Sequence, residues 1–310
     1  MRICSLLPSA TEIVFALKAE QSLIGVAHEC DYPYEATQIC KITRSKIPAD
    51  FSSREIDLTV SSTLDAAGSI YELDLDLLET LQPDLVLTQR LCNVCAVSFD
   101  DVVQAVESLK SRPRVINLEP NSLADILASI CTVGEAIGRE SEAETLVHSL
   151  QLRIDAIRSK TKYLLTKPRV LCLDWVDPPY CGGHWMKELV EIAGGIDNFS
   201  NHRRPAHRLN WQRVLELSPE LIVLTCCGFG LDRCAAEGHI LARLEAVREL
   251  PATKSGRIFA TDGSAYFSRP GPRIVESLEI LAHLIHPNIF PAPPLAKAFS
   301  RLDFLRVTTA

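Results

Sequence analysis

The segment LQPDLVL at residues 81–87 decides the fold, because the similar segment LSPELIV returns at residues 217–223. In both segments the end of a helical pattern is followed by a proline and an acidic residue, and then by an apolar run typical of a buried strand. Two such segments so far apart indicate that the chain contains two related halves rather than a short-period repeat.

Outward from each segment, strand-like apolar runs alternate with helical patterns. The predicted strands span residues 2–7, 23–27, 85–88, 114–118, 169–173, 221–225 and 257–261. The predicted helices span residues 9–17, 73–81, 99–109, 186–192, 211–217 and 274–285. Strands that alternate with helices favour a mostly parallel sheet covered on both faces, so each half is expected to be an α/β lobe.

Residues from about 122 to 165 lack strand patterning and carry an apolar stripe at helical spacing through Leu146, Leu150 and Ile154. We therefore predict an α/β fold of two lobes with mostly parallel sheets, bridged by one long helix. The predicted boundaries are an N-terminal lobe at 1–120, a helical connector at 121–167 and a C-terminal lobe at 168–310.

The chain has 310 residues and a formal net charge of −7. This acidity argues against nucleic-acid binding, which depends on Lys and Arg at phosphates. The first apolar run is interrupted too early for a secretory signal, and no run reaches the ~18 residues of a membrane span. We therefore expect a cytoplasmic protein without membrane insertion.

The chain has 11 cysteines, and an odd count does not indicate a disulfide framework. Cysteines inside apolar runs are predicted to be small buried hydrophobes. These are Cys4, Cys131 and Cys172. His207, which lies among polar residues, is predicted to be a surface residue.

Polar, Gly-rich and aromatic loops follow five of the predicted strands. They span residues 27–32, 89–95, 174–185, 226–230 and 262–270. Ligands of open α/β sheets bind outside the carboxyl ends of the strands. If the two lobes face each other, these loops line one cleft, which is the predicted ligand site.

Candidate metal ligands are concentrated in these loops, because thiolate and imidazole groups are the ligands of tetrahedral zinc. The candidates are Cys92, Cys95, Cys181, His184, Cys226 and Cys227. Zinc and an Fe–S cluster are both permitted. The alternative is that Cys92 and Cys95 form a redox-reactive or buried pair, and that His184 only faces the cleft.

Two further features of these loops carry chemistry. Arg269 and Arg273 flank a Pro-Gly-Pro turn that starts a helix, where a carboxylate or phosphate of a ligand can dock; the alternative is a salt bridge within the lobe. Cys226 and Cys227 can supply a thiolate nucleophile, although the GxSxG and phosphate-loop motifs of hydrolases are absent.

Four parts of the sequence resemble a known family. SLLPSATE at 5–12, HECDYP at 28–33, DPP at 177–179 with GG at 194–195, and YFSRPGPR at 266–273 are similar to the cobalamin and iron-chelate substrate-binding proteins of ABC importers, in the subgroup called cobalamin-binding proteins. The resemblance spans about residues 2–286. It implies two α/β lobes bridged by one long helix, with the ligand held between them.

The hypothesis we favour is a soluble binding protein of this fold that holds a metal-containing ligand, above all a corrinoid, with His184 as a candidate ligand to the metal. The candidate contacts are His28, Tyr32, Gln89, Trp175, Tyr180, Trp185, Tyr266, Phe267, Arg269 and Arg273. Two alternatives stay open. One is a metal-ion or Fe–S protein that uses the cysteines and His184, and the other is an enzyme that uses a thiolate at Cys227.

Members of this family dock on their transporter through an acidic residue on each lobe, seven positions before the proline of the repeated segments. Asp76 occupies that place in the first half, but Gln212 occupies it in the second. This departure argues against docking on an ABC transporter and favours a cytoplasmic binding or carrier role.

Overall fold

The structure, a computed structural model, describes residues 1–48, 50–67, 70–90, 99–291, 295 and 297–304. Contacts divide the chain into two compact units. Unit 1 comprises Met1–Pro120 and Ala124–Ser149, and unit 2 comprises Asn121–Leu123 and Leu150–Ala310. This division is based on contacts alone and assigns parts of the predicted connector to both units. The three domain boundaries drawn from the sequence therefore stay a prediction.

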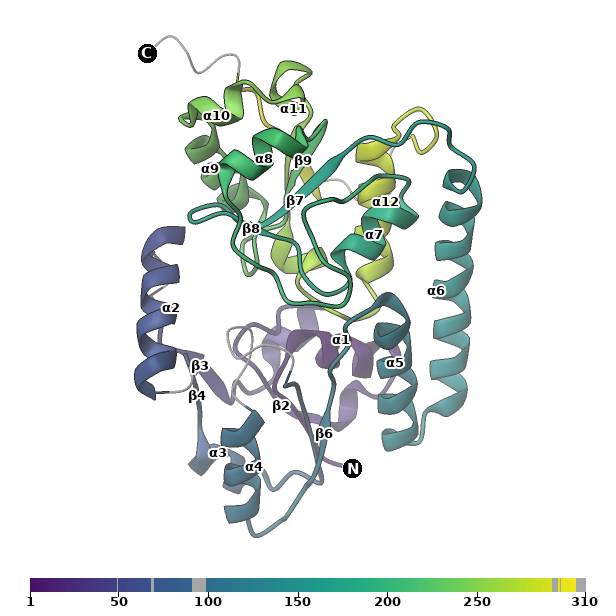
Figure 1. Cartoon of the computed structure of the whole chain (residues 1–310). Helices are drawn as coiled ribbons and strands as arrows, with labels where there is room; N and C mark the ends of the chain where they lie inside the picture. The colour runs from purple at the N-terminus through teal and green to yellow at the C-terminus, as the bar shows by residue number, and fades with distance from the viewer. Residues whose placement is uncertain (49, 68–69, 91–98, 292–294, 296, 305–310) are drawn as a thin grey trace. The chain divides into compact units, whose positions relative to one another are not determined.

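A four-stranded parallel sheet organises unit 1 (Figure 1). Its strands are, in order across the sheet, β2 (Leu23–Val26), β1 (Ile3–Ser5), β5 (Leu85–Thr88) and β6 (Arg114–Asn117). The central strands β1 and β5 are buried along their whole length, which explains their uninterrupted apolar sequences. Because every pairing is parallel, the four carboxyl ends meet at one edge, called here the carboxyl edge of unit 1.

Helices and a small two-stranded antiparallel sheet complete unit 1. They are α1 (Pro8–Ala16), η1 (Glu20–Ser22), η2 (Tyr34–Gln38), β3 (Thr43–Ser45), α2 (Ser53–Ala67), β4 (Tyr71–Leu73), α3 (Leu75–Leu81), α4 (Phe99–Ser108) and most of α5 (Leu123–Ile137). The buried cluster of the core joins β1 and β5 to α3 and α4 through residues such as Cys4, Leu78, Val86 and Val102. Burial raises the pKa of the Cys4 thiol to about 12, which confirms this cysteine as an unreactive core residue.

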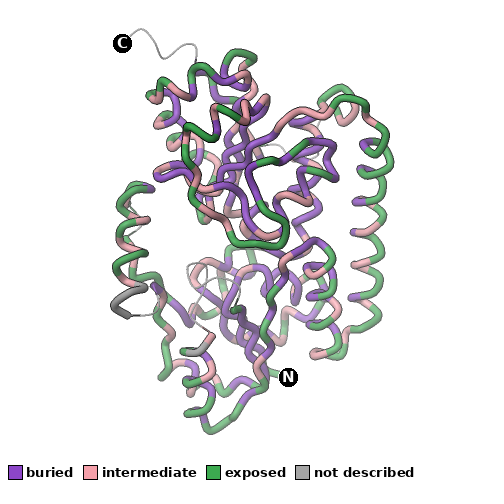
Figure 2. The backbone as a smooth tube through the Cα atoms, in the orientation of Figure 1, coloured by how far each residue is buried: buried purple, intermediate pink, exposed green. Residues whose placement is uncertain are grey.

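Unit 2 is built on a five-stranded mixed sheet. Across the sheet its strands are β11 (Phe299–Arg301), β10 (Ile258–Thr261), β9 (Leu221–Leu224), β7 (Val170–Trp175) and β8 (Tyr180–Cys181). The three central strands are parallel and the two edge strands run antiparallel to their neighbours. Figure 2 shows the central strands as buried segments. The carboxyl ends of β7, β9 and β10 therefore lie together, at what is called here the carboxyl edge of unit 2.

The helices of unit 2 include the three predicted from the sequence, α7, α8 and α12, together with four further helical elements. They are α7 (Met186–Ile192), α8 (Trp211–Leu217), α9 (Leu231–Ala242), α10 (Glu245–Arg248), α11 (Pro251–Lys254), the π-helical turn η3 (Gly263–Phe267) and α12 (Ile274–Ile285). Helix α9 packs on β9, β10 and β11, while α12 packs on α7 and η3. None of the helices among the residues that the structure describes is both long enough and apolar enough to cross a membrane.

The segments repeated in the sequence adopt the same structure in both units. Helices α3 and α8 both end in a residue with left-handed backbone, Gln82 (φ 41°) and Ser218 (φ 48°), before the proline. The acidic residue that follows the proline, Asp84 or Glu220, accepts a hydrogen bond from the backbone N–H of Arg2 (2.7 Å) or Arg169 (3.0 Å). The predicted relationship between the two halves is thus visible as a shared helix–turn–strand.

The same arginines complete this framework at the amino edge of each sheet. Nε of Arg2 donates to the carbonyl oxygen of Leu81 at 3.0 Å, and Nε of Arg169 donates to the carbonyl oxygen of Ser218 at 2.8 Å. Both arginines therefore bind carbonyl groups left unpaired at a helix end, which is where positive charge is stabilising.

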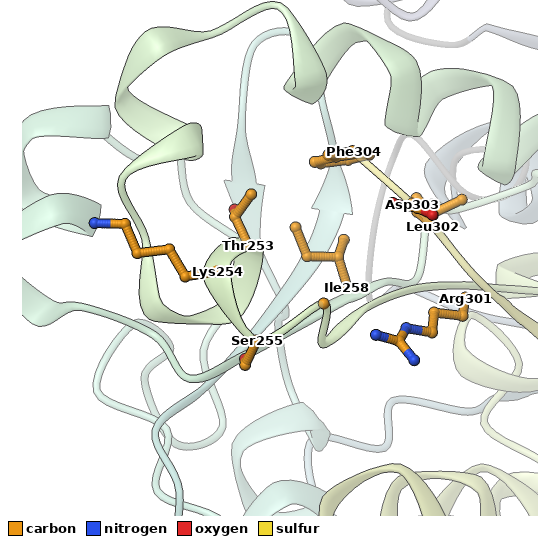
Figure 3. A pocket seen from close by; sticks show the side chains of 9 residues that line it. Thr253, Lys254, Ser255, Ile258, Arg301, Leu302, Asp303 and Phe304 are labelled. Carbon is orange, nitrogen blue, oxygen red and sulfur yellow. The ribbon is translucent and has the colours of Figure 1, made fainter. Parts of the chain in front are cut away.

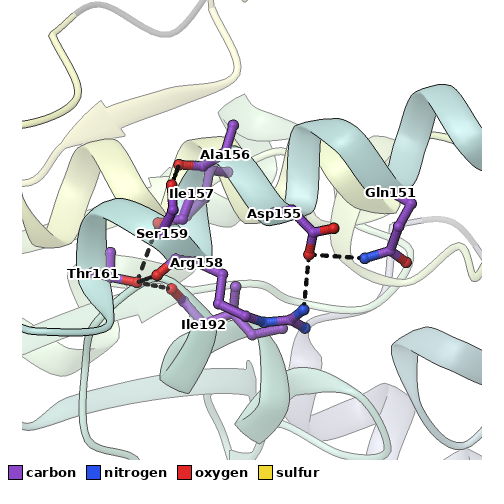
Figure 4. A network of polar contacts seen from close by, with 8 residues as sticks. All are labelled: Gln151, Asp155, Ala156, Ile157, Arg158, Ser159, Thr161 and Ile192. Atoms are coloured by element: carbon purple, nitrogen blue, oxygen red, sulfur yellow. Dashed lines mark hydrogen bonds and ion pairs between the residues drawn. The ribbon is translucent and has the colours of Figure 1, made fainter.

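Helix α6 (Glu140–Thr161) is shared, since residues up to Ser149 belong to unit 1 and those from Leu150 to unit 2. Its last turn is fixed in unit 2 by Thr161, whose buried hydroxyl donates to the carbonyl oxygen of Ile192 at the end of α7 at 2.7 Å (Figure 4). On the exposed side Asp155 accepts from both Gln151 (3.0 Å) and Arg158 (2.9 Å). The predicted long helix is confirmed, with a break from α5 at Gly138 (φ 69°).

The fold class predicted from the sequence is confirmed: two α/β units, each with a mostly parallel sheet. Two expectations about single residues are wrong. Cys131 is half-buried rather than buried, because it lies on the same side of α5 as the exposed Ala128 and Glu135. His207 is also half-buried, because its imidazole contacts the Cys181 thiol rather than solvent alone (Nδ1–Sγ 3.0 Å).

Candidate functional site

Three loops at the carboxyl edge of unit 2 are tied into one surface. Asp174 at the end of β7 accepts the Thr225 hydroxyl at 2.9 Å and the backbone N–H of Gly183 at 3.3 Å. The backbone N–H of Ser264 donates to the carbonyl oxygen of Phe229 at 3.0 Å. The predicted loops at 174–185, 226–230 and 262–270 are therefore in mutual contact.

Gly263 is the closest point of approach between two of these loops. A Cβ atom at this position would lie 2.2 Å from the carbonyl oxygen of Cys226 and 2.7 Å from the carbonyl carbon of Thr225. Any side chain would push the loops apart, since real Cβ atoms do not approach backbone so closely. Glycine is thus required where β10 passes into η3.

Aromatic rings and cations form layers on this surface. The rings of Trp175 and Phe229 lie 4.9 Å apart and tilted, and the Arg233 guanidinium lies 3.7 Å above the Phe229 ring. A cation this close to a ring is held by the negative ring face. Trp175 is half-buried, so the part of its ring that is not in contact with Phe229 is a candidate stacking face.

A second aromatic–cation pair comes from the segment after β10. The Arg273 guanidinium lies 5.6 Å from the centre of the half-buried Tyr266 ring. Arg269 donates to the Ser264 hydroxyl at 3.3 Å. Both arginines are nearly buried, 5% exposed for Arg269 and 8% for Arg273, and neither is without a partner.

Two of the predicted aromatic contacts lie inside unit 2. The indole N–H of Trp185 donates to the carbonyl oxygen of Phe267 at 3.2 Å, and both side chains are at most 5% exposed. Both rings therefore pack in the interior of unit 2 under the loops rather than on its surface. Tyr180 in β8 is half-buried and pairs across the strand with Trp175.

His184 is held in an unusual backbone conformation, with φ at 53°. Its backbone N–H donates to the carbonyl oxygen of Arg204, and its carbonyl oxygen accepts from the N–H of Arg203. Its Nδ1 atom lies 3.0 Å from Oδ1 of Asn121, and its ring stacks on Trp185 at 5.6 Å. Burial lowers the pKa of His184, so the ring is held neutral.

Three of the remaining predicted metal ligands, Cys181, Cys226 and Cys227, lie among the described residues. The Cys181 thiol contacts His207, and burial raises the pKa of Cys181 to about 11. A hydrogen bond with the Cys234 thiol, followed by burial, raises the pKa of Cys226 and keeps it protonated. Cys227 is half-buried. Cys92 and Cys95 lie outside the described residues, and among the described ones no group of three or more His, Cys, Asp or Glu side chains is arranged to hold a metal ion.

The carboxyl edge of unit 1 is organised around His28. Thr43 Oγ1 accepts the backbone N–H of His28 at 3.0 Å and lies 2.7 Å from its Nδ1 atom. The Tyr71 ring lies 5.3 Å from the imidazole. Burial, followed by the positive charge of Lys41, lowers the pKa of His28.

Behind His28 the unit 1 edge is buried and hydroxyl-rich. The Thr11 hydroxyl donates to Ser5 Oγ at 2.9 Å and lies 3.1 Å from the Cys30 thiol, and all three side chains are buried. Gln89, after β5, is also buried, whereas Tyr32 is 48% exposed. The predicted contacts His28, Tyr32 and Gln89 thus all lie after strands of this sheet, but they differ widely in exposure.

A hollow of about 490 Å³ lies elsewhere in unit 2 (Figure 3). Ile258, the first residue of β10, and the residues after β11 line it together with Thr253 and Arg301. It therefore lies toward the amino end of β10, away from the loops described above. The hollow is not part of the carboxyl edge.

The chain, with its two units and the polar and aromatic loops at their carboxyl edges, is similar to known proteins in sequence and in fold. The sequence profile of the family described as "Periplasmic binding protein" matches residues 3–265, most of the chain. The chain belongs to the periplasmic binding protein family. Membership of this family makes the chain a substrate-binding protein, which confirms the family predicted from the sequence.

Individual relatives cover most of the chain at low identity. An uncharacterised ABC transporter substrate-binding lipoprotein, YvrC of Bacillus subtilis, is 25% identical over 93% of this chain and 81% of its own length. A vitamin B12-binding protein of Vibrio cholerae is 22% identical over 90% of this chain and 86% of its own length. A periplasmic heme-binding protein from Pseudomonas aeruginosa shares the fold, with a TM-score of 0.70, 16% identity and 97% coverage of both chains.

These comparisons correct three expectations. The prediction of a cytoplasmic protein is wrong, because the family and these relatives are periplasmic proteins or lipoproteins. The argument against docking on an ABC transporter is not supported, since a relative is an ABC transporter substrate-binding protein; Asp76 and Gln212 both lie exposed in the first turns of α3 and α8. Zinc and an Fe–S cluster find no support among the relatives.

Sequence reasoning missed several residues of these surfaces. Arg233 was missed because helix α9 was not predicted, and Thr43 because its strand is only three residues long. Asn121 follows β6 at a carboxyl end, and that loop was not among the five considered. Attention to every strand end would have found Asn121.

Proposed function

We propose that this chain binds a metal-containing tetrapyrrole, a corrinoid or a haem, and delivers it to an ABC transporter. The observation that carries the proposal is the group of rings and cations at the carboxyl edge of unit 2, where Trp175 and Arg233 both contact the Phe229 ring and Tyr266 lies beside Arg273. Flat conjugated ligands bind on aromatic faces, and guanidinium groups bind the carboxylates or phosphate that such ligands carry.

The relatives support the same ligand class. The vitamin B12-binding protein aligns with 90% of this chain, and a heme-binding protein shares its fold. Corrinoid and haem are both macrocycles with a central metal and acidic or amide side chains, so one ring-and-cation surface suits either. That the ligand lies in a cleft between two lobes stays a prediction, as do the individual contact residues.

Fluorescence titration tests the proposal, because the chain has only three tryptophans. Purified protein is titrated with ferric haem, with aquocobalamin, with cobinamide and with an iron–siderophore chelate. We expect at least one of the first three to bind and to quench Trp175, with Trp175→Ala weakening binding by about tenfold or more.

Trp211→Phe is the matched control, since Trp211 is half-buried at the start of α8 and belongs to neither ring pair. This variant is expected to retain binding and quenching. Binding of the siderophore chelate alone, or tetrapyrrole binding that is unchanged in Trp175→Ala, would overturn the proposal.

A further inference from the structure

His184 carries signs of a function that its surroundings do not explain. A non-glycine residue with φ near 53° is strained, and such strain persists where the neighbouring structure fixes it. Here backbone hydrogen bonds to Arg203 and Arg204, in and after a turn, hold the residue in place. The loop therefore presents this imidazole in one fixed orientation.

The hydrogen bond to Asn121 fixes the ring proton. Oδ1 of an amide can only accept, so at 3.0 Å the Nδ1 atom of His184 carries the hydrogen. The neutral ring then has its lone pair on Nε2. Among the described residues Nε2 has no hydrogen-bond partner.

A neutral imidazole with Nδ1–H bound to an oxygen acceptor is the usual arrangement of a metal-binding histidine. The acceptor orients the ring and raises the basicity of the other nitrogen. The Trp185 ring, stacked at 5.6 Å and itself anchored through its indole N–H to Phe267, prevents the imidazole from tilting. Orientation, tautomer and packing are thus all set before a ligand arrives.

We propose that Nε2 of His184 is an axial ligand to the metal of the bound tetrapyrrole, and that Asn121 is the positioning residue that fixes its tautomer. This inference rests on the proposed function. It also narrows the ligand class, because the metal must have an open or exchangeable axial position, as in ferric haem, aquocobalamin or cobinamide.

The experiment compares ferric haem with metal-free protoporphyrin IX, which has the same ring and carboxylates but no axial site. Wild-type protein is expected to bind ferric haem more tightly than the metal-free ring and to give the absorption spectrum of histidine-ligated iron. In His184→Asn the preference for the metal-containing ring falls by about tenfold and that spectrum is lost. Asparagine is chosen because it tolerates positive φ.

A second variant guards against a folding effect. His184→Gly also accepts positive φ, and added imidazole is expected to restore the ligated spectrum. His239→Asn, on helix α9, is the matched control and should leave spectrum and preference unchanged.

Asn121 is tested through the spectrum as well. Asn121→Leu removes the acceptor and is expected to give a mixture of ligated and unligated iron, whereas Asn121→Asp, which keeps an acceptor, restores full ligation. If Asn121 were only structural, the variants would change stability, but the haem spectra of Asn121→Leu and Asn121→Asp would not differ.

The outcomes separate the two proposals. Failure of every tetrapyrrole to bind overturns the proposed function. Binding of both rings with equal affinity, or an unchanged haem spectrum in His184→Asn, overturns axial ligation by His184 while the proposed function stands.

Discussion

The amino edges of the two units are alike, whereas their carboxyl edges differ. At the amino edges Asp84 and Glu220 accept the same backbone hydrogen bond, from Arg2 and Arg169, and each arginine side chain donates to a carbonyl oxygen at the end of the helix that precedes the acidic residue. Five residues beyond each partner the likeness ends: Leu7 and Gln89 in unit 1 stand where unit 2 has Asp174 and Thr225. The shared edge holds the fold, and the divergent edge is where ligand chemistry has room to vary.

The two histidines show this divergence most clearly. In each unit a half-buried histidine has its Nδ1 atom engaged, by Thr43 in unit 1 and by Asn121 in unit 2. An amide oxygen can only accept, which leaves a lone pair on Nε2 of His184. The Thr43 hydroxyl already accepts the His28 backbone N–H and can donate its own hydrogen to Nδ1, an arrangement that leaves a hydrogen on Nε2 of His28. The unit 2 edge thus offers an imidazole lone pair, and the unit 1 edge offers an imidazole N–H donor.

The largest effect that we expect comes from the close contact found at the unit 2 edge. Gly263→Ala places a methyl group against the backbone of Thr225 and Cys226 and should lower the free energy of unfolding by about 3 kcal/mol. Chemical denaturation measures the loss. Gly230→Ala is the control from the same surface, since its Cβ meets no atom within 4 Å, and an equal loss in the control would disprove the packing argument.

The next effect tests the hydrogen bonds of Asp174, a residue that is replaced by Leu7 in unit 1. Asp174→Ala removes the acceptor both of the Thr225 hydroxyl, at the end of β9, and of the Gly183 N–H, in the loop after β8, so the free energy of unfolding should fall by about 2 kcal/mol. Thr225→Val removes one of these bonds and should cost about half as much. A loss in Thr225→Val as large as that in Asp174→Ala would show that the carboxylate does not connect the two loops.

A smaller effect tests the likeness of the amino edges. Asp84→Ala and Glu220→Ala each remove the acceptor of an arginine backbone N–H at the start of a strand, and each should cost about 1 kcal/mol. Thermal unfolding of the two variants gives the comparison. Loss of stability in one variant only would mean that the two frameworks, although alike in geometry, contribute unequally.

The smallest effect is a pH dependence that both edges share. Burial lowers the pKa of His28 and of His184 below the ordinary 6.5, so the unfolded chain binds protons first as the pH falls through 6.5. The folded chain, which keeps both imidazoles neutral, is therefore most stable above pH 6.5, and it loses stability as the pH falls from 6.5 to the lowered pKa values of the folded state. The melting temperature should therefore fall between pH 7.5 and 5, and less steeply in His28→Gln.

A profile in His28→Gln that is as steep as that of the wild type would show that His28 does not titrate on unfolding.

The sequence predicted the framework well because the framework is local. Helices such as 186–192 and 274–285 and the strand at 85–88 have clear periodicity and stops, and the structure gives them the same bounds. Helix α9 was not predicted, since Gly238 interrupts its pattern; a Cβ there would lie 2.3 Å from the end of the Leu302 side chain, which would have to move. Strand β11 was missed because only its distant pairing with β10 makes it a strand.

The candidate surfaces were predicted only in part. The loops follow from strand ends, but which side chains face outward depends on contacts that are distant in sequence. Trp185 and Phe267 have the residue types of ligand contacts, yet a hydrogen bond between them places both inside unit 2. The partnership of His184 with Asn121, 63 residues away, has no local signal.

The turns after α3 and α8 have a practical consequence for protein engineering. Gln82 and Ser218 adopt left-handed backbone although neither is glycine or asparagine. Replacing each by glycine relieves a conformational penalty of about 0.5 kcal/mol or more, and the gains should add because the turns are independent. The same substitution rule can thus raise the melting temperature at two positions, Gln82 and Ser218, both of which lie away from the surfaces proposed to bind the ligand.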